Sequence, residues 1–168
     1  MVSTLDVSSL VREHAAYVMR TLRHLGVRSE DLDDVAQETF LVVHRRRNDW
    51  DPARGPVRHW IYGICVQHVR HYRRALARRR EVVGEHAPPA ENASVEAAWD
   101  ARRLAEWVLG HLDEEKRAVF VLFEIEELPM NEVVDIVGCP LKTGYSRLHA
   151  AREIVARAHR TARERGWT

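Results

Sequence analysis

Apolar residues recur every three or four positions through almost the whole chain, and this spacing restricts the fold more than any other feature. It is clearest near the C-terminus, at Leu141, Gly144, Leu148, Ala151, Val155 and Ala158. Such spacing puts one face of an α-helix against a core. No apolar–polar alternation lasts long enough to predict a strand, and only 8 of the 168 residues are glycine. The sequence therefore predicts an all-α protein.

Turn-forming residues divide the helical pattern. The motif NDWDPARGP and the tripeptide Gly138-Cys139-Pro140 both interrupt it. The stretch EVVGEHAPPAENAS, residues 81–94, has small polar residues and no periodic apolar face, which predicts a flexible acidic linker. We expect two small helical domains, residues 1–80 and 95–168, joined by this linker. The expected helices span residues 6–25, 29–48, 57–80, 95–112, 113–126, 130–137 and 141–163.

Charge is segregated along the chain, although the net charge is only +1. Residues 54–80 contain eight arginines and no acid, residues 81–140 contain fourteen acids and four bases, and residues 141–168 contain seven bases and two acids. Two basic blocks separated by an acidic one predict two surfaces that contact a polyanion. Solvated helix faces are the alternative, which an acid-free run of this length makes harder to accept.

Several classes of protein are disfavoured. No apolar run approaches the roughly 18 residues of a membrane span, and the N-terminus lacks the basic start and apolar block of a secretion signal. Two cysteines cannot build a disulfide framework. We expect a cytoplasmic protein with two unpaired thiols and no membrane insertion.

The two segments 130–137 and 141–163, with a tight turn between them, predict a helix-turn-helix whose second helix enters the major groove of DNA. The outer side of the second segment carries residue types that contact phosphates and base edges: Lys142, Thr143, Tyr145, Ser146, Arg147, His149 and Arg152. Simple packing of two amphipathic helices is the alternative.

The segment 29–48 has two distinct faces. Its expected core stripe is Leu32, Val35, Ala36, Thr39, Phe40 and Val43. A separate face carries Asp34, Gln37, Glu38, Leu41 and Arg45. A leucine beside charged residues and away from the core stripe indicates a partner surface, with an isolated exposed leucine as the alternative.

Three blocks of sequence together resemble the extracytoplasmic-function (ECF) group of bacterial sigma factors: DLDDVAQETFLVVHRR, WDPARGPVRHWIYGICVQHVRHYRR and LDEEKRAVFVLFEIEELPMNEVVDIVGCPLKTGYSRLHAAR. They occur in the family's order and spacing and cover most of the chain. The resemblance implies a non-enzymatic subunit that needs no cofactor and directs core RNA polymerase to promoter DNA. It also implies that the face with Asp34, Gln37, Glu38 and Leu41 grips the clamp coiled coil of the polymerase.

The resemblance assigns the loop at residues 48–58 and the helix after it to opening of DNA at the −10 element. Melting needs cations for the backbone and aromatic rings that can stack on unpaired bases. The candidate −10 residues are Asn48, Trp50, Arg54, Arg58, Trp60, Gln67, Arg70, Arg73 and Arg74. Tyr62 is a further candidate for stacking, whereas Trp60 is expected in the core or at its rim. The helix-turn-helix would read the −35 element, and the linker would pass through the polymerase.

The sequence departs from the family pattern at a few positions. Gln67 and His71 stand where Asn and an acid are common, which puts the promoter sequence in doubt rather than the role. Gly144 and Tyr145 replace a typical Val-Lys pair, and Val134 replaces a typical Ala. We hypothesise that Gly144 and Val134 compensate for each other in volume. Because no sensor segment follows the reading helix, the resemblance implies control by a separate anti-sigma protein.

Two other functions fit parts of the sequence. Cys65, His68 and His71 are spaced as metal ligands on one helix can be, but they lie among arginines that repel a cation. A metal enzyme is therefore the weaker alternative. A stand-alone helix-turn-helix repressor is the other alternative, and it would bind its operator without polymerase.

Overall fold

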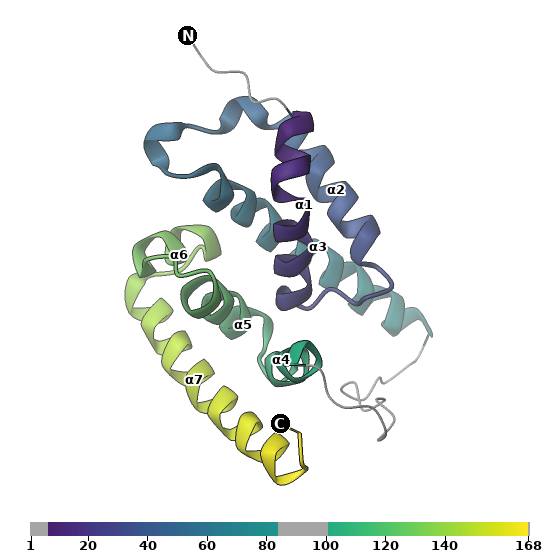
Figure 1. Ribbon diagram of the computed structural model, residues 1–168, viewed down its shortest axis with the longest axis vertical. Helices are drawn as coiled ribbons and strands as arrows, with labels where there is room; N and C mark the ends of the chain where they lie inside the picture. Colours follow the sequence, from purple (N-terminus) through teal and green to yellow (C-terminus); the bar gives the residue numbers. More distant parts are fainter. Residues whose placement is uncertain (1–6, 84–100, 168) are drawn as a thin grey trace. The chain divides into compact units, whose positions relative to one another are not determined.

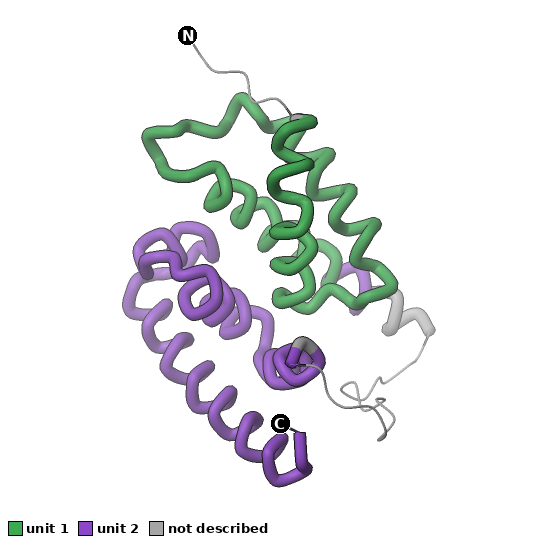
Figure 2. The backbone as a smooth tube through the Cα atoms, viewed as in Figure 1, with its two compact units in different colours: residues 1–73 green, residues 74–168 purple. Residues whose placement is uncertain are grey.

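A computed structural model of the chain describes residues 7–83 and 101–167 (Figure 1). All regular structure in these residues is helical, with no strand among them, which confirms the all-α prediction. The chain divides into two compact units, residues 1–73 and 74–168 (Figure 2). The elements in chain order are α1 (Val7–Leu25), α2 (Leu32–Arg45), the short 3-10 turns η1 (Arg47–Asp49) and η2 (Pro52–Arg54), α3 (Val57–Val83), α4 (Ala101–Gly110), α5 (Glu114–Phe120), the π-helical segment η3 (Val121–Ile125), α6 (Met130–Val137) and α7 (Leu141–Glu164).

In the first unit, α1, α2 and the first part of α3 build the core. The ring of Tyr17 on α1 packs edge to face on that of Tyr62 on α3, with ring centroids 4.9 Å apart. The stripe expected on α2 is buried except for Phe40, which is half-buried. The hydroxyl of Thr39 donates to the carbonyl of Val35 at 2.8 Å, so this polar group is satisfied inside the core.

Two side chains of α3 hold the connection between α1 and α2. The hydroxyl of Tyr72 donates to Oδ2 of Asp31 at 2.6 Å, just before α2 begins. Burial, and then this hydrogen bond to Asp31, raise the pKa of Tyr72. Nη2 of Arg73 donates to the carbonyl of Leu25 at 2.8 Å, at the last residue of α1. A cation at this position satisfies a carbonyl that the helix itself leaves unpaired.

In the second unit, α7 packs against α4, α5 and α6. Leu148, Ala151, Ala158 and Ala162 of α7 are buried there. Asp113 caps α5 by accepting a hydrogen bond from the backbone N–H of Lys116 at 2.9 Å. The residues expected as one helix, 113–126, form α5 followed by the π-helical η3 instead.

The predicted boundary between helix and linker needs a correction. α3 runs to Val83, so residues 81–83, expected in the linker, are helical. The helix continues because no strong helix breaker occurs before Gly84. The rest of the predicted linker, residues 84–94, and the predicted start of the next helix, residues 95–100, lie outside the described residues. Within the described ranges, no helix is long and apolar enough to cross a membrane.

Candidate polymerase and nucleic-acid interfaces

The side of α2 opposite its buried stripe is polar except for one leucine. Asp34, Gln37, Glu38 and Arg45 are exposed there, and Leu41 is 51% exposed. The core is filled from the other side of the helix. Packing within the unit therefore does not require Leu41, and an exposed leucine among charged side chains is suited to contact with a partner.

The loop between α2 and α3 is held by its own hydrogen bonds. At its start, Nε of Arg46 donates to Oδ2 of Asp49 at 2.8 Å. Asp51 then accepts a hydrogen bond at 2.9 Å from the backbone N–H two residues further on. Across the loop, Nε1 of Trp50 donates to the carbonyl of Gly55 at 3.3 Å. Gly55 has a φ of 125°, which side-chain-bearing residues rarely adopt. The loop therefore has a defined shape that uses the indole N–H of Trp50.

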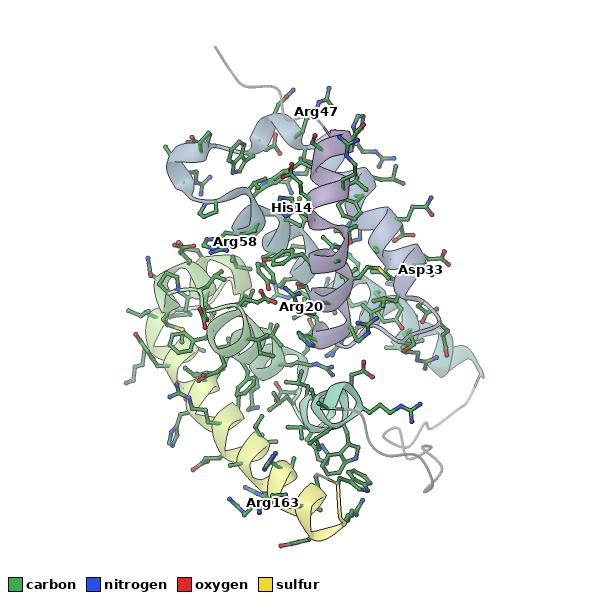
Figure 3. All side chains as sticks on the ribbon, viewed as in Figure 1. His14, Arg20, Asp33, Arg47, Arg58 and Arg163 are labelled. Carbon is green, nitrogen blue, oxygen red and sulfur yellow. The ribbon has the colours of Figure 1, made fainter. Side chains whose placement is uncertain are left out.

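The candidate −10 residues of this loop and of the start of α3 are mostly exposed. Arg58, labelled in Figure 3, is the second residue of α3 and follows directly after the loop. Trp50 and Trp60 are half-buried, which agrees with the expected place of Trp60 at the rim of the core. The exposed candidates are Asn48, Arg54, Arg58 and Gln67.

Tyr62 is a correction to the sequence-based expectation. Its side chain is fully buried and packs on Tyr17, so it cannot stack on a base in this structure. It lies on the core side of α3 with Ile61 and Cys65, which are also fully buried. The proximity of an aromatic residue to a basic segment did not reveal which side of the helix it occupies.

The arginines of α3 differ in their surroundings. Arg70 and Arg73 are half-buried, whereas Arg74 is exposed. Arg73 reaches the carbonyl of Leu25, as described above, and so stabilises the end of α1. Arg74, one residue later, presents its charge to solvent.

The turn between α6 and α7 has the geometry that its sequence suggests. Gly138 adopts the left-handed conformation, with φ 74° and ψ 51°, and its N–H donates to the carbonyl of Val134 at 2.8 Å. The N–H of Cys139 donates to the same carbonyl at 3.1 Å. Pro140 then precedes α7. Two helices thus meet at a tight turn, and Gly144 of α7 is buried against α6.

The outer side of α7 contains the candidate −35 residues. Lys142, Tyr145, Ser146, His149 and Arg152 are exposed, and Thr143 and Arg147 are half-buried.

Two of these arginines are already engaged within the unit. Nη2 of Arg147 lies 2.6 Å from Oε2 of Glu115. Nη2 of Arg152 lies 2.6 Å from Oε1 of Glu124, and its guanidinium stands over the ring of Phe123 at 5.8 Å. Contact with a phosphate would have to compete with these carboxylates.

One apolar residue at the start of α7 was assigned wrongly from the sequence. Leu141 was expected on the buried face, but it is 51% exposed. The buried stripe begins at Gly144, where α6 comes closest. Leu141 lies about one turn before it, at the N-terminal end of α7. Its apolar spacing could not reveal this, because periodicity does not tell where the neighbouring helix ends.

The possible metal ligands do not form a site. Among residues 7–83 and 101–167, no three His, Cys, Asp or Glu side chains are grouped so that they could hold a metal ion. Cys65 is fully buried, and desolvation raises the pKa of its thiol to about 12, which opposes formation of the thiolate that a metal needs. Desolvation also lowers the pKa of His68, and His71 is exposed.

Comparisons with known proteins agree on one family. Residues 10–79 match Sigma-70 region 2. The chain is 28% identical over 156 residues to the RNA polymerase sigma factor CnrH of Cupriavidus metallidurans, covering 85% of this chain and 81% of that protein. It is 33% identical over 150 residues to the ECF RNA polymerase sigma factor SigE of Mycolicibacterium smegmatis, covering 86% of this chain and 58% of SigE.

Solved structures point the same way. CnrH, solved in complex with the cytosolic domain of CnrY, aligns with a TM-score of 0.64 and 26% identity over 92% of this chain and 88% of that chain. The sigma factor RpoE of Bartonella quintana, solved in complex with the anti-sigma factor NepR, aligns with a TM-score of 0.75 over 91% of this chain and 96% of that chain; at 14% identity this likeness concerns the fold. The chain belongs to the extracytoplasmic-function group of RNA polymerase sigma factors.

Proposed function

We propose that this sigma factor binds core RNA polymerase through the outer side of α2, opens promoter DNA with the loop before α3, and reads the −35 element with α7. The observation that carries this proposal is the exposed Leu41 among charged residues, on the side of α2 that the core does not use. Catalysis belongs to the polymerase in this proposal, and the chain itself needs no cofactor. The place of action is the cytoplasm, where polymerase and promoter DNA meet.

The proposal for α2 rests on the chemistry of its outer side. Asp34 and Glu38 offer carboxylates that can pair with basic side chains of a partner, and Leu41 beside them offers apolar area. A mixed surface of this kind gives both orientation and affinity, because charge steers the encounter and apolar burial stabilises the complex. Gln37 and Arg45 extend the same side of the helix.

The proposal for the −10 element rests on the defined shape of the loop between α2 and α3. A loop that captures an unpaired base binds it more tightly when the loop already has a defined shape, because ordering it on binding costs affinity. The hydrogen bonds of Asp49, Asp51 and Trp50 supply that order. The exposed Arg54 and Arg58 supply cations for the backbone. In this arrangement Trp50 shapes the loop, rather than presenting its N–H to DNA.

The proposal for the −35 element rests on α7 and the turn before it. In a helix-turn-helix, the N-terminal residues of the second helix contact base edges. Lys142, Tyr145 and Ser146 are exposed in that part of α7. His149 lies further along the same helix and is also exposed, and Arg147 and Arg152 would reach phosphates by exchanging their carboxylate partners.

An anti-sigma protein is the proposed regulator. The two structural relatives were solved in complex with the cytosolic domain of CnrY and with the anti-sigma factor NepR. By analogy, a protein of this class would cover the exposed polymerase-binding side of α2 and thereby prevent assembly with the polymerase.

Transcription with purified components tests the proposal. Core RNA polymerase from the source organism would be given a genomic promoter library, with and without the purified chain, and the transcripts sequenced. We expect discrete new start sites only when both proteins are present. If the chain binds particular DNA sites tightly by itself and adding polymerase yields no start sites, it is a repressor instead.

A further inference from the structure

Two exposed apolar side chains stand next to each other at the start of α7. Leu141 is its first residue and is 51% exposed, and Tyr145 is 53% exposed. Among the described residues, the other two exposed large hydrophobic side chains are Leu41, at 51%, and Ile125, at 37%. Residues four apart lie on the same side of a helix, with Cβ atoms about 6 Å apart. The pair therefore forms a small apolar surface one helical turn long.

The packing of α7 fixes where this surface lies. Gly144 is buried against Val134 and Met130 of α6, so the first turn of α7 is held close to its neighbour on one side. Pro140 and the left-handed Gly138 set the direction in which α7 leaves the turn. Leu141 and Tyr145 project from a turn of helix that is anchored, and hence can act at a defined position.

The stretch of α7 around the pair is basic in sequence, although Glu115 and Glu124 of neighbouring elements pair with two of its arginines. From Leu141 to Arg152 the chain contains Lys142, Arg147 and Arg152 and no acid. A ligand that complements this surface is anionic and presents apolar groups between its charges. Duplex DNA fits both requirements, because its backbone is anionic and its major groove contains one apolar group, the C5-methyl of thymine.

We propose that Leu141 and Tyr145 recognise thymine methyl groups in the −35 element, an inference that rests on the proposed reading of that element by α7. Leu141 has no hydrogen-bonding side-chain atoms, so its contribution to sequence recognition would come from apolar contact alone. The aromatic edge of Tyr145 would extend this contact to the next base step. Sequence preference at these positions then follows the methyl group and not a hydrogen bond.

Deoxyuridine substitution tests this with the unaltered protein. Deoxyuridine lacks only the methyl group of thymidine and keeps every hydrogen-bonding atom. Each thymidine of the −35 element, on either strand, would be replaced in turn, and the affinity of the holoenzyme measured. We expect one or two positions to weaken binding about fourfold, which corresponds to loss of one buried methyl group at about 0.8 kcal/mol. Replacements outside the −35 and −10 elements serve as the DNA control.

A variant protein then tests which residue contacts the methyl group. Leu141→Ala should weaken binding to the thymidine promoter by a similar factor. The promoter affinity of this variant should not change further when deoxyuridine replaces the thymidine that Leu141 contacts. Ile125→Ala is the matched control, because Ile125 is also exposed but lies in η3 rather than α7. It should keep the full deoxyuridine effect.

The outcomes separate this inference from the proposed function. A holoenzyme that starts transcription but is indifferent to every deoxyuridine in the −35 element, or whose −35 element contains no A·T pair, overturns methyl recognition alone. Methyl recognition is also overturned if Leu141→Ala loses equal affinity on both DNAs, since the leucine would then serve a protein contact. Absence of any polymerase-dependent promoter binding would instead overturn the proposed function.

Discussion

Cγ1 of Val134 lies 2.5 Å from the position that a Cβ atom would take on Gly144. The Sδ atom of Met130 lies 3.0 Å from the same position. The φ of Gly144 is not positive, so its backbone conformation does not require glycine. The close approach of α6 requires it instead. This geometry supports the hypothesis that the larger side chain has moved from α7 to α6 relative to the family pattern.

Gly144→Val should destabilise the second unit. The new side chain would overlap Val134, whose branched Cβ leaves it little rotamer freedom, and we expect the free energy of unfolding to fall by about 1–3 kcal/mol. Adding Val134→Ala should restore much of it, with a coupling above about 0.5 kcal/mol. Urea unfolding of the wild type, the two single variants and the double variant gives both the loss in stability and the coupling free energy.

Gly63 of α3 provides the matched control. A Cβ atom there would meet nothing within 4 Å. Gly63→Ala should therefore stabilise the protein by up to about 1 kcal/mol, the usual gain of alanine over glycine inside a helix. Strictly additive effects of Gly144→Val and Val134→Ala would show that the glycine serves motion or DNA approach rather than packing.

Removing Asp34 and Leu41 should disrupt polymerase binding but not the fold. Both side chains are exposed on the outer side of α2, so Asp34→Ala with Leu41→Ala should leave the thermal midpoint nearly unchanged. Binding to core polymerase, measured by titration of labelled protein, should weaken at least about tenfold, or 1.4 kcal/mol. Asp33→Ala removes the same charge from an exposed residue that points about 100° away around the helix, and it should have little effect. Undiminished binding of the double variant would remove α2 from the interface.

Two adjacent arginines of α3 should behave differently. Arg74 is exposed, so Arg74→Ala should flatten the dependence of log K on log salt for promoter binding by about 0.9 and leave stability unchanged. Arg73 donates to the carbonyl of Leu25, so Arg73→Ala should lower the free energy of unfolding by about 1 kcal/mol. Equal salt slopes for Arg74→Ala and the wild type would exclude a phosphate contact at Arg74, and a slope change confined to Arg73→Ala would reverse the two roles.

The helical spacing of apolar residues predicted most of the core correctly, because the side chains on the covered face of a helix recur with the period of that helix. Leu32, Val35 and Val43 were expected inside from spacing alone, and all three are buried. Gly144 was likewise expected on the buried face of its helix and lies there. Such residues need only the information that one face of a helix is covered.

The residues that could not be predicted depend on where other elements lie. Leu141 fits the apolar period but lies beyond the point where α6 comes closest. Arg73 and Arg74 have the same chemistry, and only the fold brings the carbonyl of Leu25, 48 residues earlier, within reach of Arg73. The ion pair of Arg152 with Glu124 similarly joins residues 28 positions apart. Spacing along one helix contains no information about such contacts.

The two thiols should differ in reactivity. Cys65 is fully buried with its pKa raised to about 12, and Cys139 is half-buried within the turn before α7. Ellman's reagent at pH 8 should modify Cys139 of the native chain and reach Cys65 only after unfolding. Cys139→Ser should therefore leave almost no native reactivity. Rapid modification of Cys65 in that variant would mean that the first unit opens readily.

The buried thiol should also make the fold sensitive to alkali. An unfolded cysteine loses its proton near pH 9, whereas folded Cys65 keeps it up to about pH 12. Between these values the folded state binds more protons, so its stability falls as pH rises, by at most about 1.4 kcal/mol per pH unit. Urea unfolding from pH 8.5 to 10.5 should show a steeper decline for the wild type than for Cys65→Ala. Parallel curves would contradict the assignment of this sensitivity to Cys65.

Glu124→Gln should strengthen promoter binding by releasing Arg152. Nε and Nη2 of Arg152 both lie 2.6 Å from the same oxygen of Glu124, so a phosphate must compete with that carboxylate for the guanidinium. The neutral amide keeps the shape of the side chain but loses the charge. Partly exposed ion pairs contribute about 0.2–1 kcal/mol, so we expect the affinity of the holoenzyme to rise by up to about fivefold.

Two controls isolate the contribution of Arg152. Glu127→Gln removes an equal charge from an exposed residue three positions further along the chain, and it corrects for the general effect of charge. The gain from Glu124→Gln must also disappear in an Arg152→Ala background. If Glu124→Gln leaves promoter affinity unchanged and only lowers the thermal midpoint, Arg152 joins η3 to α7 as a structural residue and does not contact DNA.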